Sequence, residues 1–304
     1  MARATTPLAA ELARRPVLLD GGLSNQLADQ GCDLSGELWS ARVLDEAPDQ
    51  IEAAHTAYVR AGAEVLITAS YQVSHEGFGR RGRTAAQVDR LLRRSVELAD
   101  RAARTAPPGH PVWVAASVGP YGAVLADGSE YRGRYGLTVA ELAAFHRPRV
   151  TALLAARPDV LALETVPDTD EAEALLRVVA DSGTPAWLSY TVEGDRTRAG
   201  QPLAEAFALA AQAPEVIAVG VNCCDPHDVE GAVRLAAACG KPVVAYPNDG
   251  SVWDAATGLW HAPAAPEPWP VATWHRAGAR LVGGCCRVGP AAVAALAGEL
   301  RPAQ

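Results

Sequence analysis

The sequence lacks the features that mark secreted, membrane-spanning and nucleic-acid-binding proteins. Among 304 residues, no apolar run approaches the about 18 residues of a membrane span, and Glu11, Arg14 and Arg15 interrupt the N-terminal segment before a signal-peptide core could form. Lys and Arg number 27 against 35 Asp and Glu, a net charge of −8. Proteins that bind phosphate backbones or anionic membranes normally carry the opposite sign. We expect a cytoplasmic protein with small-molecule partners and neither nucleic acid nor membrane.

Motifs of several common enzyme classes are also missing. The 7 histidines form no H-x-H or H-E-x-x-H pattern, which argues against metal-dependent hydrolases. The turn Asp20-Gly21-Gly22 is not the G-x-G-x-x-G of dinucleotide-binding folds. No repeat, low-complexity tract or charge block divides the chain. We therefore expect a single domain over residues 1–304, with its core at about residues 10–302.

Cysteine is scarce, and its spacing is unusual. Four of the 6 cysteines form two adjacent pairs at 223–224 and 285–286. Neighbouring cysteines rarely bridge one another, and zinc fingers place two to four residues between paired ligands. In a chain of this length without an export signal, such cysteines are typical of thiols kept for metal binding or chemistry.

Short β-rich segments alternate with helical patterns along the whole chain. The expected strands are residues 17–22, 64–70, 112–117, 160–165, 186–191, 215–223, 242–247 and 280–286. The expected helices are residues 48–61, 84–104, 138–156, 169–181, 202–212, 225–239, 269–276 and 290–301. Eight such units with near-continuous apolar strands predict an α/β fold, a single (β/α)8 TIM-type barrel, with an open doubly wound sheet as the alternative. The longer connections at 118–137 and 248–268 are typical of binding walls or lids.

Polar residues collect where the expected strands end, which is where barrel enzymes carry their chemistry. These residues are Asp20, Thr68, Ser70, Tyr71, Ser117, Glu164, Thr165, Tyr190, Asn222, Cys223, Tyr246, Asn248, Cys285 and Cys286. Burying an unpaired polar group costs about 1–3 kcal/mol, so a rim that served stability alone would not gather them.

Three thiols at these strand ends predict a metal site. Cys223 follows the sixth strand, and Cys285 and Cys286 follow the eighth, where Gly283 and Gly284 would let the backbone bend so that both thiols face one point. Three thiolates with one position left open form the arrangement of catalytic zinc. The alternative is that they are small buried hydrophobic residues. Packing or an unpaired position is expected for Cys32, Cys224 and Cys239.

Two carboxylates complete the predicted site. Glu164 closes an apolar run, where its charge is costly unless it meets a cation; capping the next helix is the alternative. Asp20 is either a turn residue or part of a substrate site in which the N–H groups of Gly21 and Gly22 would hold a carboxylate.

Together these motifs resemble the homocysteine S-methyltransferase family over residues 10–302. The matching segments are LLDGGLSNQL (18–27), ELW (37–39), AGAEVLITASYQ (61–72), SVGPYGA (117–123), ETVPDTDEAEALL (164–176), GVNC (220–223), YPNDG (246–250) and GGCC (283–286). The resemblance implies that Cys223, Cys285 and Cys286 are catalytic Zn²⁺ ligands. It also implies that Glu164 binds the amino group of homocysteine beside Asp20 and Gly21. Further substrate-binding candidates are Trp39, Ser70, Tyr71, Asn222, Tyr246 and Asn248.

The implied reaction is methyl transfer from a sulfonium donor to the thiolate of L-homocysteine, which forms methionine. SEYRG in the first long connection and YPNDG after the seventh strand are closest to bacterial members that use S-methylmethionine. Candidate walls for the sulfonium are Trp39, Tyr71, Tyr121, Tyr131, Tyr135 and Trp253. The alternatives are S-adenosylmethionine as donor, a betaine- or other-donor thiol methyltransferase on the same zinc site, and a non-catalytic zinc- or thiol-binding barrel. The oligomeric state stays open.

Overall fold

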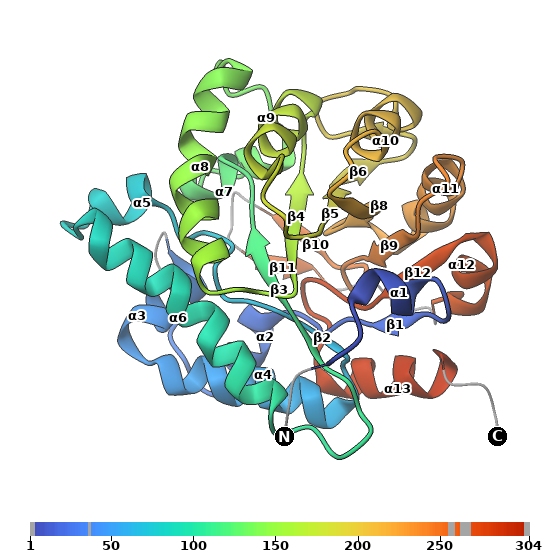
Figure 1. Cartoon of the computed structure of the whole chain (residues 1–304), viewed down its shortest axis with the longest axis horizontal. Helices are drawn as coiled ribbons and strands as arrows, with labels where there is room; N and C mark the ends of the chain where they lie inside the picture. Colours follow the sequence, from blue (N-terminus) through green and yellow to red (C-terminus); the bar gives the residue numbers. More distant parts are fainter. Residues whose placement is uncertain (1–3, 36–37, 255–258, 262–268, 301–304) are drawn as a thin grey trace.

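Eight parallel strands form the central sheet of the protein. The computed structural model describes residues 4–35, 38–254, 259–261 and 269–300. The sheet has the order β1-β12-β9-β8-β5-β4-β3-β2 (Figure 1). Its strands are β1 (Val17–Leu18), β2 (Val65–Ile67), β3 (Trp113–Val118), β4 (Val160–Val166), β5 (Ala186–Tyr190), β8 (Val216–Asn222), β9 (Val243–Tyr246) and β12 (Ala279–Val282).

The two ends of this order meet and close the sheet. Leu19 forms a parallel bridge with Val65. The Glu64 N–H donates to the Leu18 carbonyl at 2.8 Å, and the Asp20 N–H donates to the Val65 carbonyl at 3.1 Å. These bonds join β1 to β2, so the predicted TIM-type barrel is confirmed and the open-sheet alternative is wrong.

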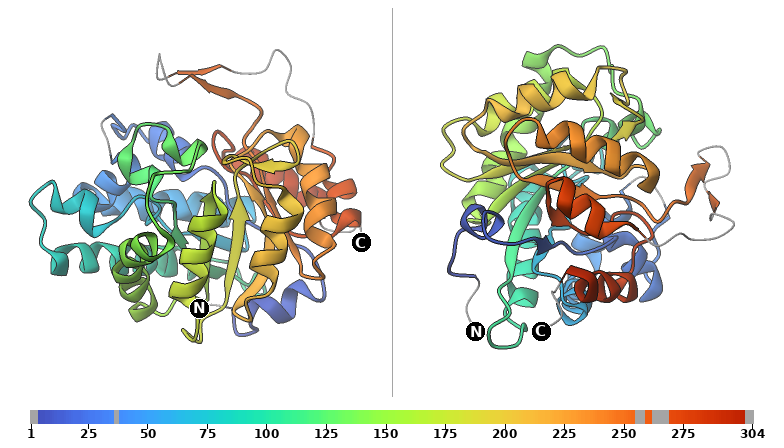
Figure 2. Two further views of the ribbon diagram at one scale, coloured as in Figure 1. Left: turned by 90° about the horizontal axis from the view of Figure 1, so that it is seen from above. Right: turned by 90° about the vertical axis from the view of Figure 1, so that its right-hand side faces the viewer.

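All eight expected helices are present and surround the barrel (Figures 1 and 2). They are α4 (Pro48–Ala61), α6 (Ala85–Ala103), α8 (Val139–Ala155), α9 (Thr169–Val179), α10 (Leu203–Ala211), α11 (Pro226–Ala237), α12 (Val271–Ala277) and α13 (Pro290–Leu300). Thr84 and Thr138 begin α6 and α8 with capping boxes, in which side chain and backbone bond reciprocally. None of the helices in the described part of the chain is long and apolar enough to cross a membrane.

Several short elements escape the sequence periodicity because they span only a turn or two. They are α1 (Leu8–Leu12), α2 (Leu23–Asp29), α3 (Trp39–Glu46), α5 (His75–Gly79), α7 (Gly122–Leu125), the 3₁₀ turn η1 (Ser129–Tyr131), and the hairpins β6 (Val192–Glu193) with β7 (Arg196–Thr197) and β10 (Val252–Asp254) with β11 (Leu259–His261). The first long connection carries α7 and η1, and the second carries the β10–β11 hairpin, which projects from the barrel (Figure 2).

Several strands are shorter than expected, and the strand predicted at 64–70 spans only Val65–Ile67. The strand predicted at 17–22 ends at Leu18, and the strand predicted at 280–286 ends at Val282. Beyond these points the backbone bonds to loops: the Gly284 N–H donates to the Asp20 carbonyl at 3.2 Å, and the Cys285 N–H donates to the Pro247 carbonyl at 2.7 Å. The glycine-rich ends therefore belong to the rim of the barrel.

Side-chain alternation along the strands decides which residues reach the barrel interior. On β3, Trp113 and Ala115 belong to the inner apolar cluster, whereas Val114 and Ala116 belong to the layer under the helices. The same parity carries Ser117 inward at the end of β3, because successive strand side chains point to opposite faces. On β9, Val244 and Tyr246 share the inner face. The polar side chains at these strand ends therefore lie in the top layer of the barrel interior.

Strands β8 and β9 approach each other closely at Gly220. A Cβ atom there would lie 2.0 Å from the Val244 carbonyl oxygen, a contact that only glycine avoids. We expect Gly220→Ala to lower the free energy of unfolding by about 1–3 kcal/mol, measured by urea denaturation. The matched control is Gly231→Ala on the exposed face of α11, where a Cβ meets nothing within 4 Å. That variant should gain up to about 1 kcal/mol, since alanine is the better helix former. Equal stability of the two variants would contradict the close approach.

Candidate metal centre and active site

Three cysteine sulfurs meet at the C-terminal mouth of the barrel. The Sγ atoms of Cys223, Cys285 and Cys286 lie within 4.8 Å of one another, and those of Cys223 and Cys286 are 3.7 Å apart. Ligands on a tetrahedral zinc with Zn–S bonds of about 2.3 Å would be about 3.8 Å apart. Within the residues that the structure describes, no other group of three His, Cys, Asp or Glu side chains has such spacing. The trio therefore fits a metal ion that takes its fourth ligand from elsewhere.

The end of β9 holds the trio together, because β9 lies between β8 and β12. The Cys223 N–H donates to the Tyr246 carbonyl at 3.2 Å, and the Cys285 N–H donates to the Pro247 carbonyl. Asn248 Oδ1 accepts the Cys286 N–H at 3.1 Å. Cys223 itself has a φ of +50°, a left-handed conformation that a non-glycine residue keeps only when its surroundings enforce it.

Gly283 and Gly284 serve the trio by their small size. Neither is among the glycines with positive φ, so the backbone here uses no conformation that is reserved for glycine. A Cβ on Gly284 would lie 2.1 Å from Cγ1 of Val288, and one on Gly283 would lie 2.5 Å from Cβ of Leu19. The two positions bring the chain of Cys285 close against β1, and a larger residue would push it away.

The three thiols of the trio differ in their pKa values. The pKa of Cys223 lies well below its usual range, because the thiols of Cys285 and Cys286 hydrogen-bond to its sulfur; Tyr131 and Asn248 add further hydrogen bonds. The hydroxyl of Tyr131 is 3.2 Å from Cys223 Sγ. The pKa values of Cys285 and Cys286 are raised, first by their hydrogen bonds with Cys223. One thiol of the trio ionises readily, and a bound cation would favour ionisation of all three.

The other cysteines lie outside this group, as expected. Cys224 is buried in the apolar core, and burial raises its pKa. Cys32 and Cys239 are partly buried and pack against the same core.

Glu164 points into the mouth by the ordinary alternation of β4, since Val160 and Ala162 belong to the inner apolar cluster, and a β-bulge follows it. On β4, Leu163 pairs with Leu188 and Val166 pairs with Tyr190, so β4 has one residue more than β5 between these pairs. Thr165, in the bulge, has a φ of +57°, which is rare for a β-branched residue. The bulge re-aims the residues after Glu164 instead, so that Val166 belongs to the outer apolar layer. Glu164 is 6% exposed, and its carboxylate accepts hydrogen bonds from Ser117 Oγ and, at 3.0 Å, from the Tyr246 hydroxyl.

A closed circuit of hydrogen bonds fixes this bulge. Asn222 Oδ1 accepts the Thr165 N–H at 2.7 Å and the Ser189 hydroxyl at 2.8 Å, while Asn222 Nδ2 donates to Thr165 Oγ1 at 2.8 Å. Ser189 Oγ lies 3.1 Å from the hydroxyl of Tyr246, which in turn bonds Glu164. The amide of Asn222 is thus engaged within the fold, and its direct effect is to hold the backbone beside Glu164.

Asp20 lies at the other side of the mouth with an unused oxygen. Its carboxyl group is 2% exposed; Oδ2 accepts the Ile67 N–H at 2.8 Å, and Oδ1 is buried without a hydrogen-bond partner among the described residues. Burial raises its pKa well above the usual range, and the charge of Glu164 adds to the shift. The neighbouring Gly21 contacts the Val288 carbonyl so closely that a Cβ would lie 2.2 Å from its oxygen. The Gly22 N–H donates to that carbonyl at 2.9 Å, so it is not available for a ligand, contrary to expectation.

The comparisons with known proteins agree on one family. The model of the homocysteine S-methyltransferase family matches residues 17–300. The homocysteine S-methyltransferase of Escherichia coli (strain K12) is 45% identical, covering 95% of this chain and 97% of that protein. This chain belongs to the homocysteine S-methyltransferase family. It is therefore an enzyme of the methyltransferase class.

Solved structures of the family have the same architecture. Crystal structures of the homocysteine methyltransferase MmuM from Escherichia coli in oxidized and metallated forms match with TM-scores of 0.87 and 0.86 at 42% and 43% identity. Both comparisons cover 97% of this chain and 100% of the other. The metallated form shows that a close relative of this methyltransferase binds metal.

Among the aromatic residues predicted to form walls for the donor, some contact the cysteine trio and others pack elsewhere. Tyr131 bonds Cys223, whereas Tyr121 packs against Tyr135 and Phe145 with ring centroids 5.3 and 4.9 Å away. Trp39 begins α3 and Trp253 lies in β10, but both side chains fall outside the described part of the chain.

Ser70 and Tyr71 are held from outside the barrel by a buried cation. The Ser70 hydroxyl donates to the Ser117 carbonyl at 2.7 Å. Arg149 of α8 donates to the carbonyls of Ser70, Tyr71 and Gly119 at 3.2, 2.6 and 2.9 Å. Arg149 escapes sequence reasoning because it lies in the middle of a helix whose pattern predicts only packing.

Sequence reasoning also missed two acidic residues in and around the first long connection. Glu171 of α9 is fully buried, and its Oε1 lies 2.8 Å from His146 Nε2 and accepts the Tyr121 N–H at 2.6 Å. Glu130 of η1 is 4% exposed. The only signal for Glu130 is its place in SEYRG, a segment without periodicity.

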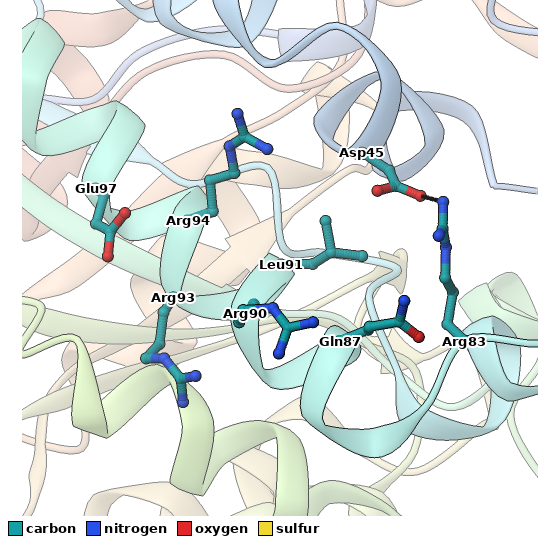
Figure 3. Close-up of a pocket in the computed structure, with 8 residues that line it drawn as sticks. All are labelled: Asp45, Arg83, Gln87, Arg90, Leu91, Arg93, Arg94 and Glu97. Atoms are coloured by element: carbon teal, nitrogen blue, oxygen red, sulfur yellow. Dashed lines mark hydrogen bonds and ion pairs between the residues drawn. The ribbon is translucent and has the colours of Figure 1, made fainter.

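A hollow on the outer layer lies apart from the predicted site residues (Figure 3). It is lined by Asp45, Arg83, Gln87, Arg90, Leu91, Arg93, Arg94 and Glu97 of α3, α6 and the residue stretch before α6. Asp45 and Arg83 form an ion pair across it at 2.5 Å. It contains no residue predicted for catalysis or substrate binding.

Glu164 should make the stability of the enzyme depend on pH. Burial raises its pKa from 4.5 to about 7, so the folded state binds a proton that the unfolded state releases. The stability contributed by this protonation is present below about pH 4.5 and is lost as the pH rises through about 7. Full ionisation of Glu164 in the folded state lowers the free energy of unfolding by about 3 kcal/mol at most.

We expect Glu164→Gln to be more stable than the wild type at about pH 8, with a difference that shrinks towards about pH 5. Urea denaturation in chelator and reductant at both pH values measures this. The exposed Glu205→Gln on α10 is the control and should show no such pH-dependent gain. A Glu164→Gln gain that is the same at both pH values would contradict the raised pKa.

Proposed function

We propose that the protein transfers a methyl group from the sulfonium S-methylmethionine to the thiol of L-homocysteine. The new bond joins the homocysteine sulfur to the methyl carbon, and the bond from that carbon to the donor sulfur breaks. Its electron pair returns to the donor sulfur, the homocysteine thiol releases its proton, and both products are methionine. The observation that carries this proposal is the cysteine trio at the barrel mouth beside the buried carboxylate of Glu164.

Zn²⁺ is the proposed metal, held by Cys223, Cys285 and Cys286. All-sulfur ligation of a single ion favours zinc, and three protein ligands match catalytic rather than structural sites. When bound, zinc would supply Lewis acidity that keeps the acceptor sulfur ionised at neutral pH. A free thiol of pKa about 8.5 is only a few per cent ionised at pH 7. Its full ionisation at that pH is worth about 2 kcal/mol.

Positioning of the two sulfurs contributes more than ionisation. Alignment of two reactants in a near-attack geometry is worth up to about 7–11 kcal/mol. Glu164 would hold the homocysteine ammonium, with its carboxylate kept in place by Ser117 and Tyr246. Asp20 Oδ1, buried and without a partner among the described residues, supports a second contact to the same ammonium. Asn222 acts by positioning Glu164 rather than by touching substrate.

A sulfonium donor suits the charges at the mouth. The pKa of Tyr71 is raised well above its usual range by burial and by the charges of Glu130, Cys223 and Glu164, so its ring sits among anionic groups. Tyr71 and Tyr131 offer aromatic faces to a cation. The methyl carbon of the donor, which the sulfonium makes electrophilic, would lie between the two sulfurs.

Loss of one cysteine ligand should abolish metal binding and turnover together. We expect Cys286→Ala to lose bound zinc and to fall at least about 100-fold in kcat/KM, since even changes around metal ligands cost 10–100-fold. Zinc analysis and a methionine-formation assay on the same sample measure both effects. Cys239→Ser at the end of α11 is the matched control and should retain zinc and activity. A zinc-free Cys286→Ala enzyme with full activity would refute the proposal.

Replacement of the Glu164 carboxylate should chiefly weaken the binding of homocysteine. We expect Glu164→Gln to raise KM for homocysteine by about 10- to 100-fold, because a charge-assisted hydrogen bond is lost, with a smaller change in kcat. Steady-state kinetics at saturating donor give both values. An unchanged KM would reject the role assigned to Glu164.

A donor panel separates the proposed donor from its rivals. S-methylmethionine, S-adenosylmethionine, betaine and methyltetrahydrofolate are each supplied with homocysteine, and methionine is quantified. The proposal expects the highest kcat/KM for S-methylmethionine. Preference for betaine would identify a different methyltransferase on the same thiols, and no turnover with bound zinc would favour a metal-binding barrel without this activity.

A further inference from the structure

Glu130 is a buried carboxylate that the proposed reaction does not yet use. It lies in η1, its side chain is 4% exposed, and its Oε2 has no hydrogen-bond partner among the described residues. Burial raises its pKa to about 7, and the charge of Cys223 adds to the shift. The next residue, Tyr131, places its hydroxyl 3.2 Å from Cys223 Sγ. Glu130 therefore lies near Cys223 and has no cationic neighbour within the part of the chain that the structure describes.

The backbone around Glu130 is held firmly. A Cβ on Gly122 of α7 would lie 2.4 Å from the Glu130 backbone nitrogen, so α7 and η1 pack backbone against backbone. The Gly133 N–H donates to the Ser129 carbonyl at 2.9 Å, and the Asp127 carboxylate accepts the Ser129 N–H at 3.0 Å. The position of the carboxylate is thus built into the connection.

The carboxylates at the mouth fall into two groups. Glu164 is the charged neighbour that raises the pKa of Asp20, so these two share one region. The charged neighbours of Glu130 are Cys223 and Asp127 instead. The pKa of Tyr71 is raised by burial and then by the charges of Glu130, Cys223 and Glu164, so Tyr71 has both carboxylates as charged neighbours. Cys223 is a charged neighbour of both Glu130 and Glu164.

The two regions match the charges of two amino acids. Homocysteine brings one ammonium, which the region of Glu164 and Asp20 accommodates. A second buried carboxylate needs a cation of its own. An amino-acid sulfonium carries two cations, the sulfonium and the α-ammonium, and only one of them keeps its charge during the reaction.

The sulfonium loses its charge during the reaction and the α-ammonium keeps it, and this difference decides which of the two cations Glu130 should contact. The sulfonium becomes a neutral thioether as the methyl group leaves, so a carboxylate against it would stabilise the reactant more than the transition state. The α-ammonium stays charged throughout, and its contact with a carboxylate stabilises both states equally. Contact with the ammonium therefore gives donor binding without raising the barrier.

We propose that Glu130 binds the α-ammonium group of the methyl donor and so makes the enzyme selective for sulfonium donors that are amino acids. This inference rests on the proposed methyl transfer to homocysteine, and it assigns Glu130 to the donor rather than to the acceptor.

The test compares two donors that differ only in the amino group. S-methylmethionine and 4-(dimethylsulfonio)butanoate, which lacks the α-amino group, are assayed with the zinc-loaded wild type and Glu130→Gln. Where the second compound does not serve as a donor, its inhibition constant against S-methylmethionine takes the place of kcat/KM. We expect Glu130→Gln to lower kcat/KM for S-methylmethionine by about 10- to 100-fold, mainly through KM. The value for the des-amino compound and the KM for homocysteine should change less than about twofold.

The matched control is Asp127→Asn, which removes a negative charge from the same connection but keeps the acceptor for the Ser129 N–H. It should leave both donors within about twofold of the wild type. Equal losses with both compounds in Glu130→Gln, or no loss with either, would overturn the role of Glu130. Failure of the wild type to methylate homocysteine from any sulfonium would instead refute the proposed function itself.

Discussion

The active-site chemistry depends on the short distance between sulfurs that come from opposite sides of β9. Parallel strands in a closed barrel bring their C-terminal ends to one rim, but this alone leaves neighbouring strands several ångströms apart. The carbonyls of Tyr246 and Pro247 and the amide of Asn248 close the remaining gap, because each accepts an N–H from a cysteine of the trio. The segment between the two ligand-bearing strands therefore acts as their common template.

A second layer of hydrogen bonds holds the carboxylate beside the sulfurs. The bulge of β4 is an irregularity that an isolated strand would not keep, and Asn222 stabilises it from the adjacent part of the barrel. Because Tyr246 both bonds Glu164 and accepts the Cys223 N–H with its backbone, the carboxylate and the sulfur site are mechanically connected.

The sequence allowed the barrel and the cysteine trio to be predicted, since both follow from short-range patterns. Apolar strands alternating with helices indicate the fold, and Cys223 and Cys285 stand directly after two of those strands. The roles of Ser70 and Asn222 could not be predicted, because their polar groups meet partners from other strands. Glu130 was missed because its burial depends on how η1 packs onto α7, which no periodicity encodes.

Arg149 is a fixed positive charge behind the mouth, on the helix side of the barrel. It is the one Arg or Lys among the fully buried side chains of the described residues, and although burial lowers its pKa to about 10 it stays protonated at neutral pH. Its charged neighbours are Glu171 and Tyr71, whereas the carboxyl groups of Glu130 and Glu164 at the mouth have pKa values raised by burial to about 7. The negative charge of the mouth therefore grows as the pH rises through about 7, and with it grows the preference of the entrance for cations over phosphorylated metabolites.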